Sequence, residues 1–142
     1  MKKNIGLGIV LIAFVSIAVV LFLIQFFNKK YNYPLEYEYK QSYHNNFYAE
    51  NGYVVFEDSI KIKNTTSKDL AFYMTANVSE DIGLVTDGTA TACNKDTLEK
   101  ELFFIKANSE QIYSVHFKAE KGDYDKKLNR LPPKKIIFEI AE

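Results

Sequence analysis

The sequence predicts an all-β domain, a two-sheet sandwich of about seven strands, behind one N-terminal transmembrane helix. Two observations lead to this prediction. An uncharged apolar run occupies residues 5–27, and apolar and polar residues alternate in short stretches from residue 53 to the end. Apolar residues at every second position indicate strands with one buried face, whereas the period of a helix is 3.6 residues.

The run over residues 5–27 is long enough to cross a membrane. As a helix with about 1.5 Å of rise per residue it covers about 34 Å, against a hydrocarbon core of about 30 Å. A cleaved signal peptide has a shorter apolar region and ends at small residues, whereas this run ends in "LIQFFNKKYNYP". We therefore expect a retained signal anchor, with cleavage as the alternative. Lys2 and Lys3 favour a cytoplasmic tail of residues 1–4 and an extracytoplasmic C-terminal part, which makes this a single-pass protein of the cytoplasmic membrane.

Residues 28–50 form a Tyr-rich juxtamembrane segment that includes the first strand, and residues 51–142 form the β-sandwich domain. In "YNYPLEYEYK" every second position is apolar or aromatic, with four tyrosines and Leu35. We expect Tyr37 and Tyr39 to pack on the domain as part of that strand, since Pro34 restricts the segment to a strand entry or a sheet edge. The alternatives are a stalk without a fixed face and an exposed platform, which Tyr43 would extend, for stacking a glycan.

The first half of the domain shows two strands. Residues 54–63 place Val54, Phe56, Ile60 and Ile62 on one face, and Asp58 falls on the same apolar face, which predicts a bulge or bend. Residues 64–69, "NTTSKD", are all polar and predict a hairpin connection to the next strand at residues 70–78. Asp87-Gly88, a common hairpin dipeptide, then separates two weaker strands.

Three further stretches complete the predicted sheet. Residues 102–107, "LFFIKA", are apolar on both faces, which predicts a central strand or one covered by the Tyr-rich segment. Residues 110–119 place Tyr113, Val115, Phe117 and Ala119 inward and Ser114, His116 and Lys118 outward. The last strand, "KKIIFEI", has Ile136, Phe138 and Ile140 inward and Glu139 outward.

Seven short strands with turn signals about ten residues apart indicate an immunoglobulin-like sandwich. "SIKIKNTTSKDLAFYM", "NSEQIYSVHFKAEKG" and "LPPKKIIFEI" resemble the small bacterial extracytoplasmic immunoglobulin-like domains, in which an N-T-S type turn joins two strands and a proline-flanked strand comes last. The resemblance covers about residues 53–141. It implies a fold and no functional residues, and the chain lacks the Cys…Trp…Cys signature because it has no Trp and one Cys.

Few residues of this chain are suited to catalysis or to holding a cofactor. Ser114 and His116 share one strand face about 7 Å apart, beyond hydrogen-bond reach, and we expect His44 to lie in a loop. Cys93, the only cysteine, cannot form an intrachain disulfide and is expected to be a small buried residue. We predict neither an enzyme nor a cofactor nor a metal site; calcium at the loop carboxylates Asp123 and Asp125 is the alternative.

The charge balance limits the classes of partner. Without the four lysines beside the apolar run, 14 of the 18 basic residues remain against 18 acidic residues. A net negative domain has no basic footprint for nucleic acid or anionic lipid. The sequence therefore predicts a non-catalytic interaction domain that faces the cell envelope and binds a protein or a wall glycan. The alternative is a membrane-tethered immunity protein or an accessory subunit of a membrane complex.

Overall fold

The computed structural model describes residues 12–23, 34–81, 84–123 and 131–142, and the chain divides into two compact units, Met1–Tyr33 and Pro34–Glu142. In the first unit, residues 12–23 form a helix with exposed apolar side chains, among them Phe14 and Phe22. The Ser16 hydroxyl donates a hydrogen bond to the Ile12 carbonyl at 2.9 Å. Among the described residues, no helix combines the length and the apolarity that crossing a membrane requires. The predicted span over residues 5–27 extends outside the described residues at both ends, and the anchor stays a prediction.

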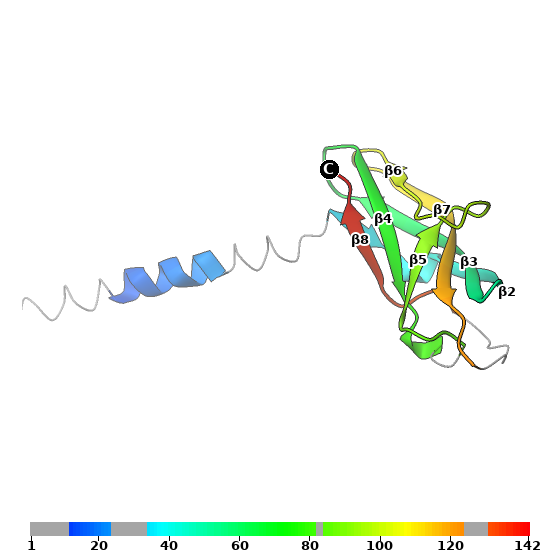
Figure 1. Ribbon diagram of the computed structural model, residues 1–142. Helices are drawn as coiled ribbons and strands as arrows, with labels where there is room; N and C mark the ends of the chain where they lie inside the picture. The colour runs from blue at the N-terminus through cyan, green and yellow to red at the C-terminus, as the bar shows by residue number, and fades with distance from the viewer. Residues whose placement is uncertain (1–11, 24–33, 82–83, 124–130) are drawn as a thin grey trace, which may run out of the picture. The chain divides into compact units, whose positions relative to one another are not determined.

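The second unit is built from β-strands, which confirms the all-β class (Figure 1). Its elements, in chain order, are β1 (Leu35–Tyr37), the 3-10 turn η1 (Tyr39–Gln41), β2 (Tyr43–Glu50), β3 (Tyr53–Asn64), β4 (Leu70–Asn77), the 3-10 turn η2 (Ser79–Asp81), β5 (Thr89–Cys93), β6 (Phe103–Ile105), β7 (Glu110–Glu120) and β8 (Ile136–Ile140). The predicted domain boundary at residue 51 falls between β2 and β3, and both β1 and β2 pair with β3.

All eight strands belong to one antiparallel sheet that is nearly closed into a barrel. The hydrogen-bonded path is β1-β3-β7-β5-β4-β6, with β2 beside β3 and β8 beside β4. In Figure 1, β8 and β4 lie at one side of the domain and β3 and β2 at the other, with β5 and β7 between them. Because β5 joins β7 to β4, the path is continuous, and the division into two separate sheets stays a prediction.

The core lies on the inner face of the curved sheet and includes most of the residues that the alternation predicts, although Ile140, predicted inward, is 38% exposed. On β3 the inward residues Val54, Phe56, Ile60 and Ile62 are fully buried, and on β7 Val115 and Phe117 are fully buried. Phe72 on β4 contacts three other rings at centroid distances of 5.7–5.9 Å, those of Phe103, Tyr113 and Phe138. Burial of such side chains supplies about 1.5–3 kcal/mol each and dominates the stability of the domain.

A two-residue turn joins β2 to β3. Asn51 and Gly52 both have positive φ, 48° and 82°, as a type I′ turn requires, and Gly52 adopts this conformation without a steric penalty. The turn sets a register in which Phe47 faces Phe56, with ring centroids 6.4 Å apart. The pairing shifts between His44 and Asn46, so β2 carries a bulge.

The predicted bulge or bend at Asp58 is wrong for its own strand, because β3 pairs regularly with β7 through Asp58, and the bulge lies opposite it in β2. Asp58 stays in a regular β3, is fully buried, and its Oδ1 lies 2.7 Å from Nδ1 of His44. The expectation that His44 belongs to a loop is wrong, because His44 lies in β2 and is paired directly opposite Asp58. A buried acidic group requires a hydrogen-bonded partner of this kind.

The predicted hairpin over residues 64–69 is also wrong, because β3 and β4 do not pair with each other. Asn64 is fully buried and its amide donates hydrogen bonds to the carbonyls of Lys68 (2.8 Å) and Lys106 (3.0 Å). Its side-chain oxygen accepts from the backbone N–H and the hydroxyl of Thr66. These bonds hold an arch that carries the chain from one part of the sheet to the other.

The two histidines allow a matched test of the buried pair. His44→Ala leaves the fully buried Asp58 carboxylate without its imidazole partner and should lower the free energy of unfolding by about 3 kcal/mol. His116→Ala removes a looser contact on the outer face, 3.4 Å from Glu57, and should cost less than about 1 kcal/mol. Urea unfolding of the fragment 31–142 measures both; equal losses would contradict the assignment of Asp58 and His44 as a structural pair.

Candidate binding surface

The residues with reactive side chains lie apart or are buried. Among the described residues, no group of three or more His, Cys, Asp or Glu side chains is placed to hold a metal ion. Asp123 is exposed, and its predicted calcium partner Asp125 lies outside the described residues. Cys93 is buried, as predicted, and burial raises the pKa of its thiol although Lys118 opposes this effect. The thiol is therefore protonated at neutral pH and is a poor nucleophile.

The three tyrosines of the predicted platform occupy different positions. Tyr37 lies in β1, is partly buried against the core, and its hydroxyl donates to the Pro133 carbonyl at 2.7 Å. Tyr39 lies in η1 with its ring edge-on to Tyr37, at a centroid distance of 6.2 Å, whereas Tyr43 at the start of β2 is 54% exposed. Tyr37 thus packs on the domain as the first strand, as expected, whereas the expectation that Tyr39 belongs to the same strand is wrong, because β1 ends at Tyr37 and Tyr39 begins η1. The use of Tyr37, Tyr39 and Tyr43 as a ligand platform stays a prediction.

Among the aromatic side chains of the described strands, the one with the largest exposed fraction lies instead on β6. Phe104 is 65% exposed, while its neighbours Phe103 and Ile105 point inward and are buried. The expectation that residues 102–107 form a central or covered strand is therefore wrong. β6 has three residues, pairs with β4 alone among the described strands, and the Tyr-rich segment pairs with β3. A large apolar ring left in water next to other apolar side chains indicates an interaction site.

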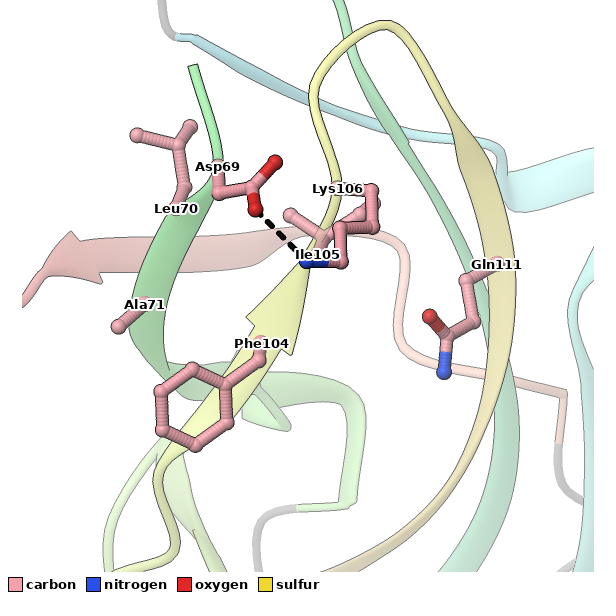
Figure 2. A pocket seen from close by; sticks show the side chains of 7 residues that line it. All are labelled: Asp69, Leu70, Ala71, Phe104, Ile105, Lys106 and Gln111. Atoms are coloured by element: carbon pink, nitrogen blue, oxygen red, sulfur yellow. Dashed lines mark hydrogen bonds and ion pairs between the residues drawn. The ribbon is translucent and has the colours of Figure 1, made fainter.

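A pocket of about 360 Å³ adjoins Phe104 (Figure 2). Its lining comes from three segments: Asp69, Leu70 and Ala71 at the start of β4, Phe104, Ile105 and Lys106 on and after β6, and Gln111 on β7. In Figure 2 the β4 residues lie on one side of β6 and Gln111 reaches toward it from the other side. An apolar lining with a few polar groups at its rim is typical of a ligand-binding site.

The polar rim of the pocket includes an exposed ion pair. Lys106 Nζ lies 2.8 Å from Asp69 Oδ2, and the other oxygen of Asp69 accepts the Ala107 N–H at 2.9 Å. These hydrogen bonds lower the pKa of the Asp69 carboxyl, and the bond to Asp69 raises the pKa of Lys106. Both groups are therefore charged at neutral pH, and the rim offers a donor and an acceptor beside the aromatic ring.

Further exposed side chains lie near the pocket, before β6 and on the outer face of β4. Leu102, the residue directly before β6, is 37% exposed. The Lys100 ammonium lies 4.2 Å from the centre of the Tyr73 ring and 2.7 Å from Glu139 on β8. We name the set Leu70, Ala71, Leu102, Phe104 and Gln111 the Phe104 surface. Its signal in the sequence is the run "LFFI", which is apolar on both faces but does not show which face stays uncovered.

Tyr113 fixes the position of the strand that carries Phe104. Its ring packs edge-on against Phe72 and Phe103, and its hydroxyl donates to the Phe104 carbonyl at 2.6 Å. β6 and β7 are not paired with each other, so this bond connects two strands that the backbone ladder leaves apart. Burial raises the pKa of Tyr113 to about 12. The hydroxyl consequently remains a donor throughout the physiological range.

Comparisons of the chain with protein-family models, curated proteins and solved structures found no match.

Replacing Tyr113 tests this link. Tyr113→Phe keeps the buried ring and removes the bond to Phe104, which should lower the free energy of unfolding by about 1 kcal/mol at pH 8. In the parent, the pKa is about 12 in the folded state and about 10 in the unfolded state, so stability is complete below pH 10 and falls as pH rises from about 10 to about 12. The parent–variant difference should therefore narrow above pH 10. A difference that stays constant to pH 12 in urea titrations of the fragment 31–142 would show that Tyr113 ionises normally.

Proposed function

We propose that the chain is a single-pass membrane protein whose extracytoplasmic, non-catalytic β domain, of immunoglobulin-like kind, binds a protein or cell-wall partner through the Phe104 surface. The observation that carries the binding site is the 65% exposure of Phe104 on a short strand held in place by Tyr113. Aromatic side chains dominate the energy of many interfaces because they bury a large area with few rotatable bonds.

The membrane part of the proposal is supported by the uncharged apolar run over residues 5–27, which holds the exposed apolar side chains of the described helix. In the same helix the Ser16 hydroxyl bonds within its own chain, as a polar group in an apolar surrounding requires. The location outside the cytoplasm is supported by the two lysines before the run, because positively charged residues beside an apolar span favour the cytoplasmic side.

Protease treatment of intact cells tests the location. With a tag at the C-terminus of the full chain, external protease should remove the tag from intact cells, and the chain should remain in the membrane fraction at full length before treatment. The control is a cytoplasmic marker protein that survives the same treatment. A tag that is protected in intact cells and lost only after lysis would place the domain in the cytoplasm.

Photo-crosslinking tests the binding surface. A benzoylphenylalanine at position 104 of the full chain, irradiated in intact cells, should give one defined adduct, while the same group at Tyr53, on the outer side of β3, should not. Digestion of the adduct with protease or with a wall hydrolase separates a protein partner from a glycan. The same adducts at both positions, or none at 104, would count against this surface.

The variant Phe104→Ser separates binding from folding. Because the ring is mostly in water, the free energy of unfolding should change by no more than about 0.5 kcal/mol. Loss of the ring should weaken partner binding by at least about 1 kcal/mol, as expected for a central aromatic contact. Because position 104 is then occupied by serine, the crosslinker is placed at position 102 instead of Leu102. The yield of its adduct with the partner should decrease strongly when Phe104→Ser is added. An unchanged adduct would show that Phe104 contributes no binding energy.

A further inference from the structure

The last strand leaves one edge of its backbone unpaired within the described sheet. β8 pairs with β4 and with no other described strand, and its register over Ile136–Ile140 is regular. Asn77 N–H donates to the Lys135 carbonyl at 3.0 Å and Ala141 N–H donates to the Ala71 carbonyl at 2.8 Å, so the odd-numbered residues of β8 face β4. The peptide groups of Ile136, Phe138 and Ile140 therefore point to the open edge.

The other strands at the border of the sheet are less suited to pairing with a further strand. β1 and β6 have three residues each, and β2 carries the bulge between His44 and Asn46, a feature that disrupts edge-to-edge pairing. β8 has five regular residues, and its sequence "IIFEI" is rich in residues that favour strands. An apolar, regular edge is a template for another strand.

The outer face of β8 is complementary to itself. Lys135, Ile137 and Glu139 follow one another on this face; Ile137 is 49% exposed and the Glu139 side chain is 69% exposed. In an antiparallel pair centred on Ile137, each Ile137 lies opposite its own copy. Each Lys135 then lies opposite Glu139 of the second copy, and this happens twice by symmetry. Opposite charges at directly facing positions stabilise a strand pair.

The same register satisfies the backbone. With Ile137 at the centre, Ile136 lies opposite Phe138 of the second copy, and the open-edge peptide groups of these residues face one another. Glu139 already contacts Lys100 at 2.7 Å, but this pair is exposed and a carboxylate can accept several hydrogen bonds. We propose that β8 is a self-association edge, through which two copies of the chain pair antiparallel about a two-fold axis at Ile137.

The expected complex is weak in dilute solution. A pair of five-residue strands buries less surface than a stable protein interface, for which the lower limit is about 1,200 Å² in total. Crosslinking of the full chain in membranes is therefore the appropriate measurement, because a covalent bond traps a weak complex. The buried Cys93 provides a suitable background, since its thiol is not accessible to a second copy.

Single cysteines report the register. Residues facing each other at a non-hydrogen-bonded position have Cα atoms about 4.5 Å apart, within the range of a disulfide. Ile137→Cys should form disulfide-linked dimers on mild oxidation, detected on a non-reducing gel. Glu139→Cys alone should not, whereas Lys135→Cys/Glu139→Cys should. Asn46→Cys, an exposed position on β2, is the control for random collision and should give no dimer.

Charge reversal tests whether Lys135 faces Glu139 of the second copy. In the Ile137→Cys background, Lys135→Glu or Glu139→Lys places like charges opposite each other and should lower the dimer fraction several-fold. The exchange Lys135→Glu/Glu139→Lys should restore it, and thermal unfolding checks that each variant is folded. Dimers of Phe138→Cys but not of Ile137→Cys would overturn the register. Dimers of Asn46→Cys at the same level, no dimer in any variant, or no rescue by the exchange would overturn the proposal.

Discussion

The ladder between β3 and β7 determines the position of every other part of the domain. It joins eleven residue pairs, from Tyr53 with Glu120 to Lys63 with Glu110, and it places the inward side chains of both strands in the centre of the core. β1 and β2 attach to one side of β3, and β5 attaches to the far side of β7. A shift of this ladder by one residue would turn every inward side chain to solvent, so the register is strongly determined.

In a nearly closed sheet, the backbone groups at places where neighbouring strands do not pair also need hydrogen-bond partners. Two tyrosines contribute here with the same chemistry: Tyr37 bonds to the Pro133 carbonyl near β8, and Tyr113 bonds to the Phe104 carbonyl on β6. Each hydroxyl donates to a backbone carbonyl that receives no hydrogen bond from a neighbouring strand at this place. The ring of each tyrosine also packs in or against the core. No described residue covers the outer side of β6 or pairs with the open edge of β8, and these are the two surfaces to which we assign partners.

Much of the inner face could be predicted from the sequence because alternation directly reports which side of a strand is buried. Val54, Phe56, Tyr113 and Phe117 all point inward as expected. Alternation does not report which strands become neighbours, so the β3–β4 hairpin was predicted wrongly and Phe104 was expected to be covered. The hairpin signal Asn51-Gly52 is present in the sequence, yet the prediction treats residues 28–50 as one segment and so misses β2 and the His44–Asp58 pair.

The position of Cys93 has a consequence for how the chain can be made. A lone accessible thiol would join to glutathione or to other proteins under oxidising conditions, and would stay reduced in a reducing compartment. Because Cys93 is buried at the end of β5, its thiol is shielded from exchange partners. The folded domain thus has the same covalent structure whatever the redox state of its surroundings, and its maturation requires neither an oxidase nor a disulfide isomerase.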